Sequence, residues 1–116
     1  MLSFDLFDHQ WQSINEDGTK YSLLEGSKEH GVFTYLFFLP AGTWDAPHWH
    51  TGDSRIYVLG GQLKLAFSND FDKSNAYSFN TGSLLFVPRN TIHFDGAETD
   101  TTILGFGNSP WSTQYV

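Results

Sequence analysis

The sequence predicts an all-β protein, a sandwich or barrel formed by two sheets. Short stretches rich in β-branched and aromatic residues recur along the chain, and turns containing glycine, proline or asparagine separate them. No helix of ordinary length is visible in the pattern. With 116 residues, 40% of them hydrophobic and 17% aromatic, the chain can bury a core of its own, so we expect a single domain over residues 1–116.

The first forty residues contain four strand signals. Residues 1–10 alternate weakly between apolar and acidic positions, which predicts an edge strand or an arm that packs on a neighbour. Short strands are expected at residues 11–14 and 21–24, because turn residues follow each of them. The run VFTYLFFL, Val32–Leu39, is β-branched and aromatic throughout and predicts a buried strand that ends at Pro40.

The rest of the chain continues the same pattern. Residues 54–59 and 62–67 are expected to pair as an antiparallel hairpin, because Gly60-Gly61 suits a two-residue turn with positive φ. The polar stretch 68–75 predicts a loop long enough for a helical turn. The remaining strands are expected at residues 76–79, 83–87, 91–94, 101–106 and 113–116.

Charge and composition exclude several classes of function. The chain has six basic and 13 acidic residues, and the basic residues are scattered, so we expect neither nucleic acids nor anionic membrane surfaces as partners. The chain has no cysteine, so any metal must be held by nitrogen or oxygen. The N-terminal stretch carries Asp5 and Asp8 and lacks a basic region, and no apolar run approaches the length of a membrane span. We therefore expect a soluble, cytoplasmic protein.

Three histidines form the candidate functional site. His48 and His50 stand two residues apart in a stretch rich in strand formers, so their side chains project from the same face with Cα atoms roughly 6.5 Å apart. His93 follows a second strand signal and a turn at residues 88–90, and a sheet that curls back would place it opposite the pair. Imidazole is a favoured ligand of zinc, iron, nickel and copper, which predicts a three-histidine metal site. His9 and His30 lie in polar or turn contexts and are expected to be solvated.

Two spaced motifs resemble those of the cupin superfamily, small double-sheet jelly-roll barrels. The matching positions are Gly42, His48, His50 and Gly61 in the first motif and Gly82, Pro88, Asn90 and His93 in the second. Asn90 stands where the motif has a glycine. This turn position needs a left-handed backbone, which glycine adopts best and asparagine next best. The stretches LEGSKEHGVFTYLFFLPAG, PHWH and GNSPWSTQYV look like those of single-domain cupins, some of them related to ChrR-type anti-sigma factors.

One departure from the cupin pattern affects the expected ligand set. The glutamate that serves as a fourth ligand in cupins aligns with Ser54, and a serine hydroxyl is a poor ligand for Zn²⁺ or Fe²⁺. The site is therefore expected to have three protein ligands and more than one open position. Asp53 would substitute only if a bulge turned it inward, because neighbouring strand residues face opposite ways.

Two aspartates and the serine are candidates for roles beside the ion. Asp95 shares the face of His93 if the strand continues straight, and would then act as a general base or as a hydrogen-bond acceptor near the metal, whereas a bend at Gly96 would remove it. Asp45 either orients a ligand imidazole or is exposed. Asp95 and Ser54 are the candidate catalytic residues.

The resemblance implies a metal-dependent enzyme that acts on a small, partly apolar organic substrate. The expected cofactor is one divalent transition metal ion, iron or zinc first, with nickel, manganese and copper left open. With iron the expected reaction is dioxygenase-type oxidation or C–C cleavage; with zinc it is Lewis-acid catalysis of the cyclase, lyase or hydrolase type. The alternative is a non-catalytic metal or ligand sensor, but ChrR-type sensors join the cupin to an effector domain, which we do not expect here. The resemblance also implies a homodimer, with Trp49 as a candidate contact.

Overall fold

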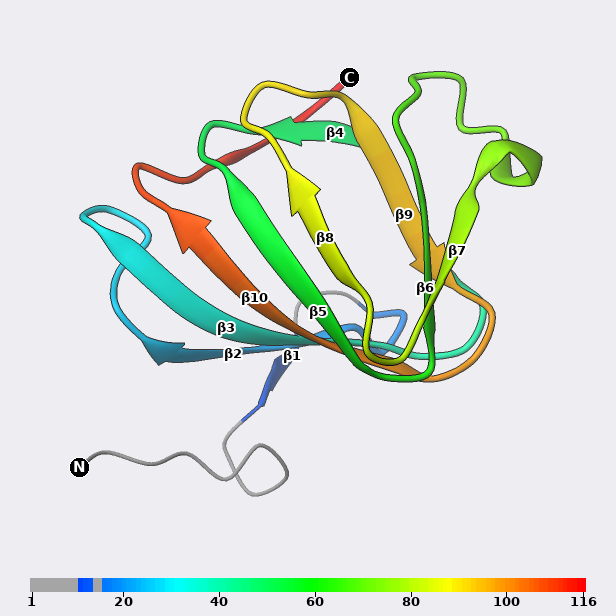
Figure 1. Ribbon diagram of the computed structural model, residues 1–116, viewed down its shortest axis with the longest axis horizontal. Coiled ribbons are helices and arrows are strands. Elements are labelled where there is room, and N and C mark those ends of the chain that lie inside the picture. Colours follow the sequence, from blue (N-terminus) through cyan, green and yellow to red (C-terminus); the bar gives the residue numbers. More distant parts are fainter. Residues whose placement is uncertain (1–10, 14–15) are drawn as a thin grey trace.

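Two antiparallel sheets make up the fold. The computed structural model describes residues 11–13 and 16–116. Within this part of the chain, the six-stranded sheet has the order β1-β2-β3-β10-β5-β8 and the five-stranded sheet the order β11-β4-β9-β6-β7 (Figure 1). The strands are β1 (Gln12–Ser13), β2 (Lys20–Glu25), β3 (Val32–Leu39), β4 (Thr43–His50), β5 (Ser54–Gly60), β6 (Gln62–Ala66), β7 (Tyr77–Asn80), β8 (Leu84–Val87), β9 (His93–Ala97), β10 (Thr101–Asn108) and β11 (Thr113–Tyr115). This is the jelly-roll architecture that the sequence predicts.

The central pair of the first sheet shows why these residues form strands. Buried and half-buried positions alternate along the whole of β10, as expected for a strand with one face on the core. Gly105 and Gly107 stand opposite Tyr35 and Phe33 of β3 in the register. A Cβ at either glycine would collide with the opposite aromatic ring, so the glycines make room for two large side chains between the sheets.

The hairpin predicted through Gly60-Gly61 is wrong. β5 pairs with β8 and β10, whereas β6 pairs with β7 and β9 in the other sheet, so Gly61 is a corner at which the chain changes sheet. Gly61 has φ of +79°, and a Cβ there would meet the backbone of Asp100 and Thr101. The Thr101 hydroxyl donates to Gln62 O and accepts from Gln62 N, both at 3.1 Å, and so fixes the start of β6 at this corner.

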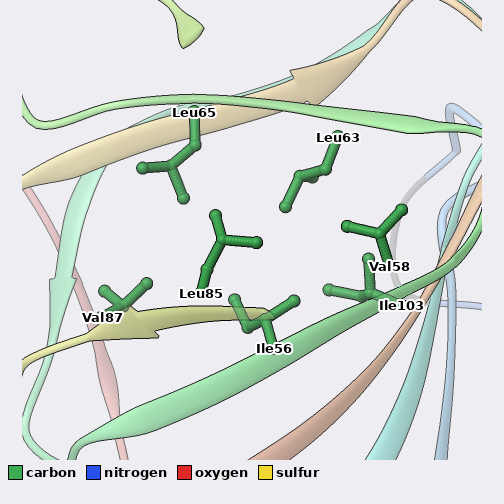
Figure 2. Packing of buried hydrophobic residues seen from close by; sticks show 7 residues of the cluster. All are labelled: Ile56, Val58, Leu63, Leu65, Leu85, Val87 and Ile103. Atoms are coloured by element: carbon green, nitrogen blue, oxygen red, sulfur yellow. The ribbon is translucent and has the colours of Figure 1, made fainter. Parts of the chain in front are cut away.

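Aliphatic side chains from both sheets form the core. Leu63 and Leu65 of β6 face residues of β5, β8 and β10 (Figure 2). The cluster consists of Ile56, Val58, Leu63, Leu65, Leu85, Val87 and Ile103, each at most 7% exposed. Burying one such side chain stabilises the fold by about 1.5–3 kcal/mol. Ile56, Val87 and Ile103 also line the cavity described below, so this core forms the floor of the site.

The turn at residues 88–90 ties the two histidine-bearing segments together. Asn90 adopts the left-handed conformation expected at this position, with φ of +62°. Its N–H donates to His50 O at 2.8 Å, and the Arg89 N–H donates to Asp53 Oδ1 at 2.8 Å. These bonds bring the start of β9 to the end of β4. The helical turn predicted in the loop 68–75 is the 3₁₀ turn Lys73–Asn75.

The N-terminal predictions are only partly covered. The strand or arm predicted over residues 1–10 lies outside the described residues, and so does His9. The strand predicted at 11–14 corresponds to β1, which pairs with Lys20 and Tyr21 of β2. His30 is exposed, as expected. In the described part of the chain, no helix has the length and apolar character needed to cross a membrane.

Candidate metal centre

Three imidazoles converge between the sheets. His48 and His50 lie near the end of β4, and His93, the first residue of β9, is the register partner of His48. The ring centroids are 4.3 Å apart for His48 and His93, 4.9 Å for His48 and His50, and 5.2 Å for His50 and His93. One ring nitrogen from each lies within 4.8 Å of the other two. This spacing suits three nitrogen ligands of a single ion.

Hydrogen bonds at Nδ1 orient the rings. His48 Nδ1 lies 2.6 Å from Ala46 O, and His93 Nδ1 lies 2.9 Å from Thr91 O. A carbonyl oxygen only accepts, so Nδ1 carries the proton in both rings and the Nε2 lone pair is left for a ligand bond. Thr113 Oγ1 of β11 lies 3.0 Å from His50 Nδ1 and orients this ring, although a hydroxyl can donate or accept and does not fix the tautomer of His50.

Burial keeps the imidazoles of His50 and His93 in the neutral form that binds metal. Burial, reinforced by the neighbouring histidines and Lys28, lowers the pKa of His50 to about 3. Burial also lowers the pKa of His93 to about 4, and the hydrogen bond that His93 Nδ1 donates to Thr91 O acts in the opposite direction. Both rings are therefore neutral at pH 7, and a metal ion would not have to displace protons from them.

A cavity of about 290 Å³ opens at the three histidines. Its walls come from both sheets and combine aromatic and aliphatic side chains with a few polar groups, among them Tyr35, Ser54 and Asp95. Trp111 stacks on His50 with ring centroids 4.3 Å apart and an interplanar angle of 20°. The volume is at the small end of ligand pockets, which indicates a small molecule.

Asp95 faces this cavity together with His93. β9 continues through Gly96 to Ala97 without the bend considered above, and the indole of Trp44 packs where a Cβ of residue 96 would be. Burial raises the pKa of Asp95 to about 7, opposed by His48 and reinforced by Asp45, its register partner on β4. The Asp95 carboxylate has no hydrogen-bond partner among the described residues.

Ser54 pairs with a tyrosine at the position of the cupin glutamate. Ser54 is 2% exposed and its Oγ lies 3.1 Å from the hydroxyl of Tyr35, which reaches across from β3. Burial raises the pKa of Tyr35 to about 12, so this hydroxyl stays protonated. Asp53 does not replace the glutamate, because its carboxylate accepts from the Arg89 N–H and does not line the cavity.

Asp45 is partly exposed and bonds elsewhere. Its Oδ2 lies 3.7 Å from His48 Nδ1, farther than Ala46 O, so the main-chain carbonyl orients that ring. The Tyr115 hydroxyl donates to Asp45 Oδ1 at 2.8 Å. Asp45, His48 and Asp95 also offer ligand atoms within 4.8 Å of one another. Since this group shares His48 with the three-histidine group, it is an alternative use of that ring and not a separate site.

Three residues at the site are not assigned a role by the sequence patterns alone. Lys28, Trp111 and Thr113 line the cavity, and they come from the loop after β2 and from β11 with the segment before it. The closing stretch GNSPWSTQYV is the one sequence signal that points to the last two, since it contributes to the family resemblance.

Comparison with known proteins decides the family. The sequence profile of the ChrR cupin-like domain matches residues 2–110. The chain belongs to the ChrR cupin-like family. A search of curated protein sequences found no significant match.

Solved structures share the fold of this ChrR cupin-like domain. The polyketide cyclase RemF from Streptomyces resistomycificus is 20% identical with a TM-score of 0.80, and the alignment covers 100% of this chain and 85% of RemF. A cupin-like protein from Thermotoga maritima is 15% identical, with a TM-score of 0.78 and coverage of 97% and 89%. A salicylate 1,2-dioxygenase from Pseudoaminobacter salicylatoxidans is 17% identical with a TM-score of 0.70; 85% of this chain matches 30% of that one. At these identities the likeness shows the cupin fold alone.

Proposed function

We propose that this cupin is a metal-dependent enzyme that acts on a small organic molecule bound next to a divalent transition metal ion. The observation that carries the proposal is the convergence of His48, His50 and His93, with ligand nitrogens within 4.8 Å of one another, at a cavity of about 290 Å³. The donor set fits the ion, because three imidazoles whose Nδ1 atoms have hydrogen-bond partners suit iron or zinc, with nickel, manganese or copper as further options. When bound, the metal would supply Lewis acidity and, in the case of iron, reactivity with O₂.

Asp95 is the proposed proton-transfer residue. Its carboxylate lines the cavity on the same strand as His93 and lacks a hydrogen-bond partner among the described residues, so its oxygens are available to a bound molecule. A carboxylate in this position can take a proton from a substrate carbon or oxygen and return it to the product. Asp95 would therefore act on the substrate and not on the ion.

The Tyr35–Ser54 pair leaves room for the substrate. No carboxylate stands where cupins have the glutamate ligand, and the two hydroxyls bond to each other at 3.1 Å. We therefore propose three protein ligands, with the remaining positions open to a chelating substrate. Both hydroxyls can also donate to a substrate oxygen if one turns from the other.

The preferred reaction class is dioxygenase-type oxidation or C–C cleavage, with zinc-type Lewis-acid catalysis as the alternative. Two structural neighbours, a salicylate 1,2-dioxygenase and a polyketide cyclase, show that this fold serves both kinds of protein. Elemental analysis of the purified protein will name the bound metal. O₂ consumption with β-diketones, flavonoids and catechols then separates the two classes, and Asp95→Asn should keep the metal but lose turnover. Metal-free protein, or unchanged turnover in Asp95→Asn, would contradict the proposal.

A metal or small-ligand sensor is the second candidate, and the match to the ChrR cupin-like profile favours it. A sensor needs the same three histidines and cavity but no proton transfer, so Asp95 would be dispensable. The two functions separate in one experiment. A metal-loaded protein that binds a candidate molecule tightly, consumes no O₂ and leaves every candidate unaltered is a sensor.

A further inference from the structure

One basic side chain, that of Lys28, lines the cavity at the three histidines. Lys28, in the loop between β2 and β3, is the only lysine or arginine among the described residues that line it. Its Nζ lies 4.3 Å from the centroid of the Tyr21 ring, which also lines the cavity. A cation over the face of a tyrosine ring is attracted by the negative π-system, so the ring holds the ammonium group at the cavity wall.

The loop that carries Lys28 is bonded to the metal centre. The Trp111 N–H donates to Lys28 O at 2.9 Å, and the Trp111 indole stacks on the ligand candidate His50. The Ser109 N–H donates to Gly31 O at 2.8 Å, and the Ser109 hydroxyl donates to Ser27 O. The main chain around Lys28 is therefore fixed relative to His50.

The ammonium group has no carboxylate partner. Between the described residues, the only ion pair within 4.0 Å joins His48 to Asp45. This is unexpected in a chain with 13 acidic and six basic residues. Of the other charged groups at the cavity, Asp17 accepts from the Thr19 N–H and hydroxyl, and Asp45 accepts from Tyr115. No carboxylate of the described residues therefore compensates the positive charge of Lys28, and this charge is available to an anionic ligand.

Charge is divided between two ends of the cavity. Lys28 lies on the side of His50, because the Trp111 N–H donates to Lys28 O and the Trp111 indole stacks on His50, whereas Asp45 is the register partner of Asp95. The cationic end is therefore near His50, and the acidic end is near Asp95. A molecule with an anionic group at one end and an ionisable proton at the other would match this arrangement.

We propose that Lys28 binds the carboxylate of an anionic substrate whose other oxygen reaches the metal, so that the substrate class is a small hydroxy or oxo carboxylate. This inference rests on the proposed function, because it uses the same cavity and ion. The carboxylate would accept from the ammonium group, and the planar rings of Tyr21 and Trp111 would flank it. Asp95 would then face the end of the substrate away from its carboxylate.

Binding to the Co²⁺-loaded protein tests this proposal, with visible absorption as the signal. The probes are salicylate against its neutral isostere salicylamide, and 3-hydroxybenzoate against 3-hydroxybenzamide. Lys28→Met should weaken binding of the carboxylates by about tenfold and leave the amides unchanged, as expected for loss of one charge-assisted contact. Lys28→Arg should retain most of the preference. Lys20→Met is the matched control, because Lys20 also lies over an aromatic ring, 5.9 Å from the Phe38 centroid, but outside the cavity.

The outcomes separate this proposal from the proposed function. If Co²⁺ binds but Lys28→Met affects carboxylates and amides equally, or affects neither, the role of Lys28 is refuted and the metal site stands. The same holds if the wild-type protein binds neither carboxylate at millimolar concentration, or if Lys20→Met has the same effect as Lys28→Met. If wild-type protein binds no Co²⁺, the metal site fails and the role of Lys28 fails with it.

Discussion

The hydrogen bond between Tyr35 and Ser54 allows a quantitative test of how the position of the cupin glutamate is filled. The two oxygens are 3.1 Å apart, both side chains are at most 9% exposed, and neither has another hydrogen-bond partner among the described residues. Tyr35→Phe or Ser54→Ala removes one partner and leaves the other buried without one. Each variant should therefore lower the free energy of unfolding by about 1–3 kcal/mol.

The double variant measures the interaction free energy between the two hydroxyl groups. Tyr35→Phe with Ser54→Ala removes both polar groups, so its destabilisation should be smaller than the sum of the single effects by about 1 kcal/mol. The measurement is urea unfolding of the metal-free protein at pH 7, followed by tryptophan fluorescence. Additive single effects, within about 0.5 kcal/mol, would refute the reasoning. Ser54→Ala should also bind metal as tightly as the wild type, because Ser54 is not a proposed ligand.

Four further predictions concern the site, the core and the assembly. His93→Ala should abolish metal uptake, and a full equivalent of metal in that variant by elemental analysis counts directly against the site. Because burial raises the pKa of Tyr35 to about 12, the stability gained from its protonated form is complete below pH 10 and is lost as the pH rises to 12, by up to roughly 3 kcal/mol. Burial also raises the pKa of Tyr21 and Tyr115, so urea unfolding between pH 9 and 12 should show a loss in both proteins that is smaller in Tyr35→Phe than in the wild type, and equal losses would contradict the prediction. Leu63→Ala, at a fully buried position, should cost about 2–5 kcal/mol, whereas Leu84→Ala, at a position 56% exposed, should cost less than about 1 kcal/mol by the same assay. The homodimer implied by the resemblance stays a prediction, which sedimentation velocity checks; a monomer at micromolar concentration would refute it.

The convergence of the histidines could be predicted because it depends on local rules. Two residues two apart on a strand share a face, so His48 and His50 had to point the same way. The turn ends at Asn90, a residue type that adopts the left-handed backbone conformation this position requires, so the turn is recognisable in the sequence. After the turn, the chain runs back so that His93 pairs with His48. The same alternation placed Asp95 beside His93.

The sheet partner of β6 could not be predicted from the local sequence. Gly60-Gly61 satisfies the backbone demands of a hairpin and of a corner between sheets equally well. The choice is made by the close contact of Gly61 with Asp100 and Thr101, about forty residues away in the chain. The residue types next to Gly60 and Gly61 do not indicate a contact with so distant a part of the chain.

The sheet partner of the C-terminal strand, β11, could likewise not be predicted from the local sequence. β11 pairs with β4, which places Thr113 against His50 and Tyr115 against Asp45. The sequence marks a short strand there but not its partner, since any open edge satisfies the backbone of a three-residue strand.

By itself, the sequence determined the class of fold, the strands, the three imidazoles and the absence of a carboxylate at Ser54, because alternation, turn residues and motif spacing act over a few residues. Only the tertiary structure decided which sheet each strand joins and which groups surround the histidines. Tyr35, Lys28, Trp111 and Thr113 reach the cavity from distant segments, and their positions follow from how the two sheets pack, which no local pattern records.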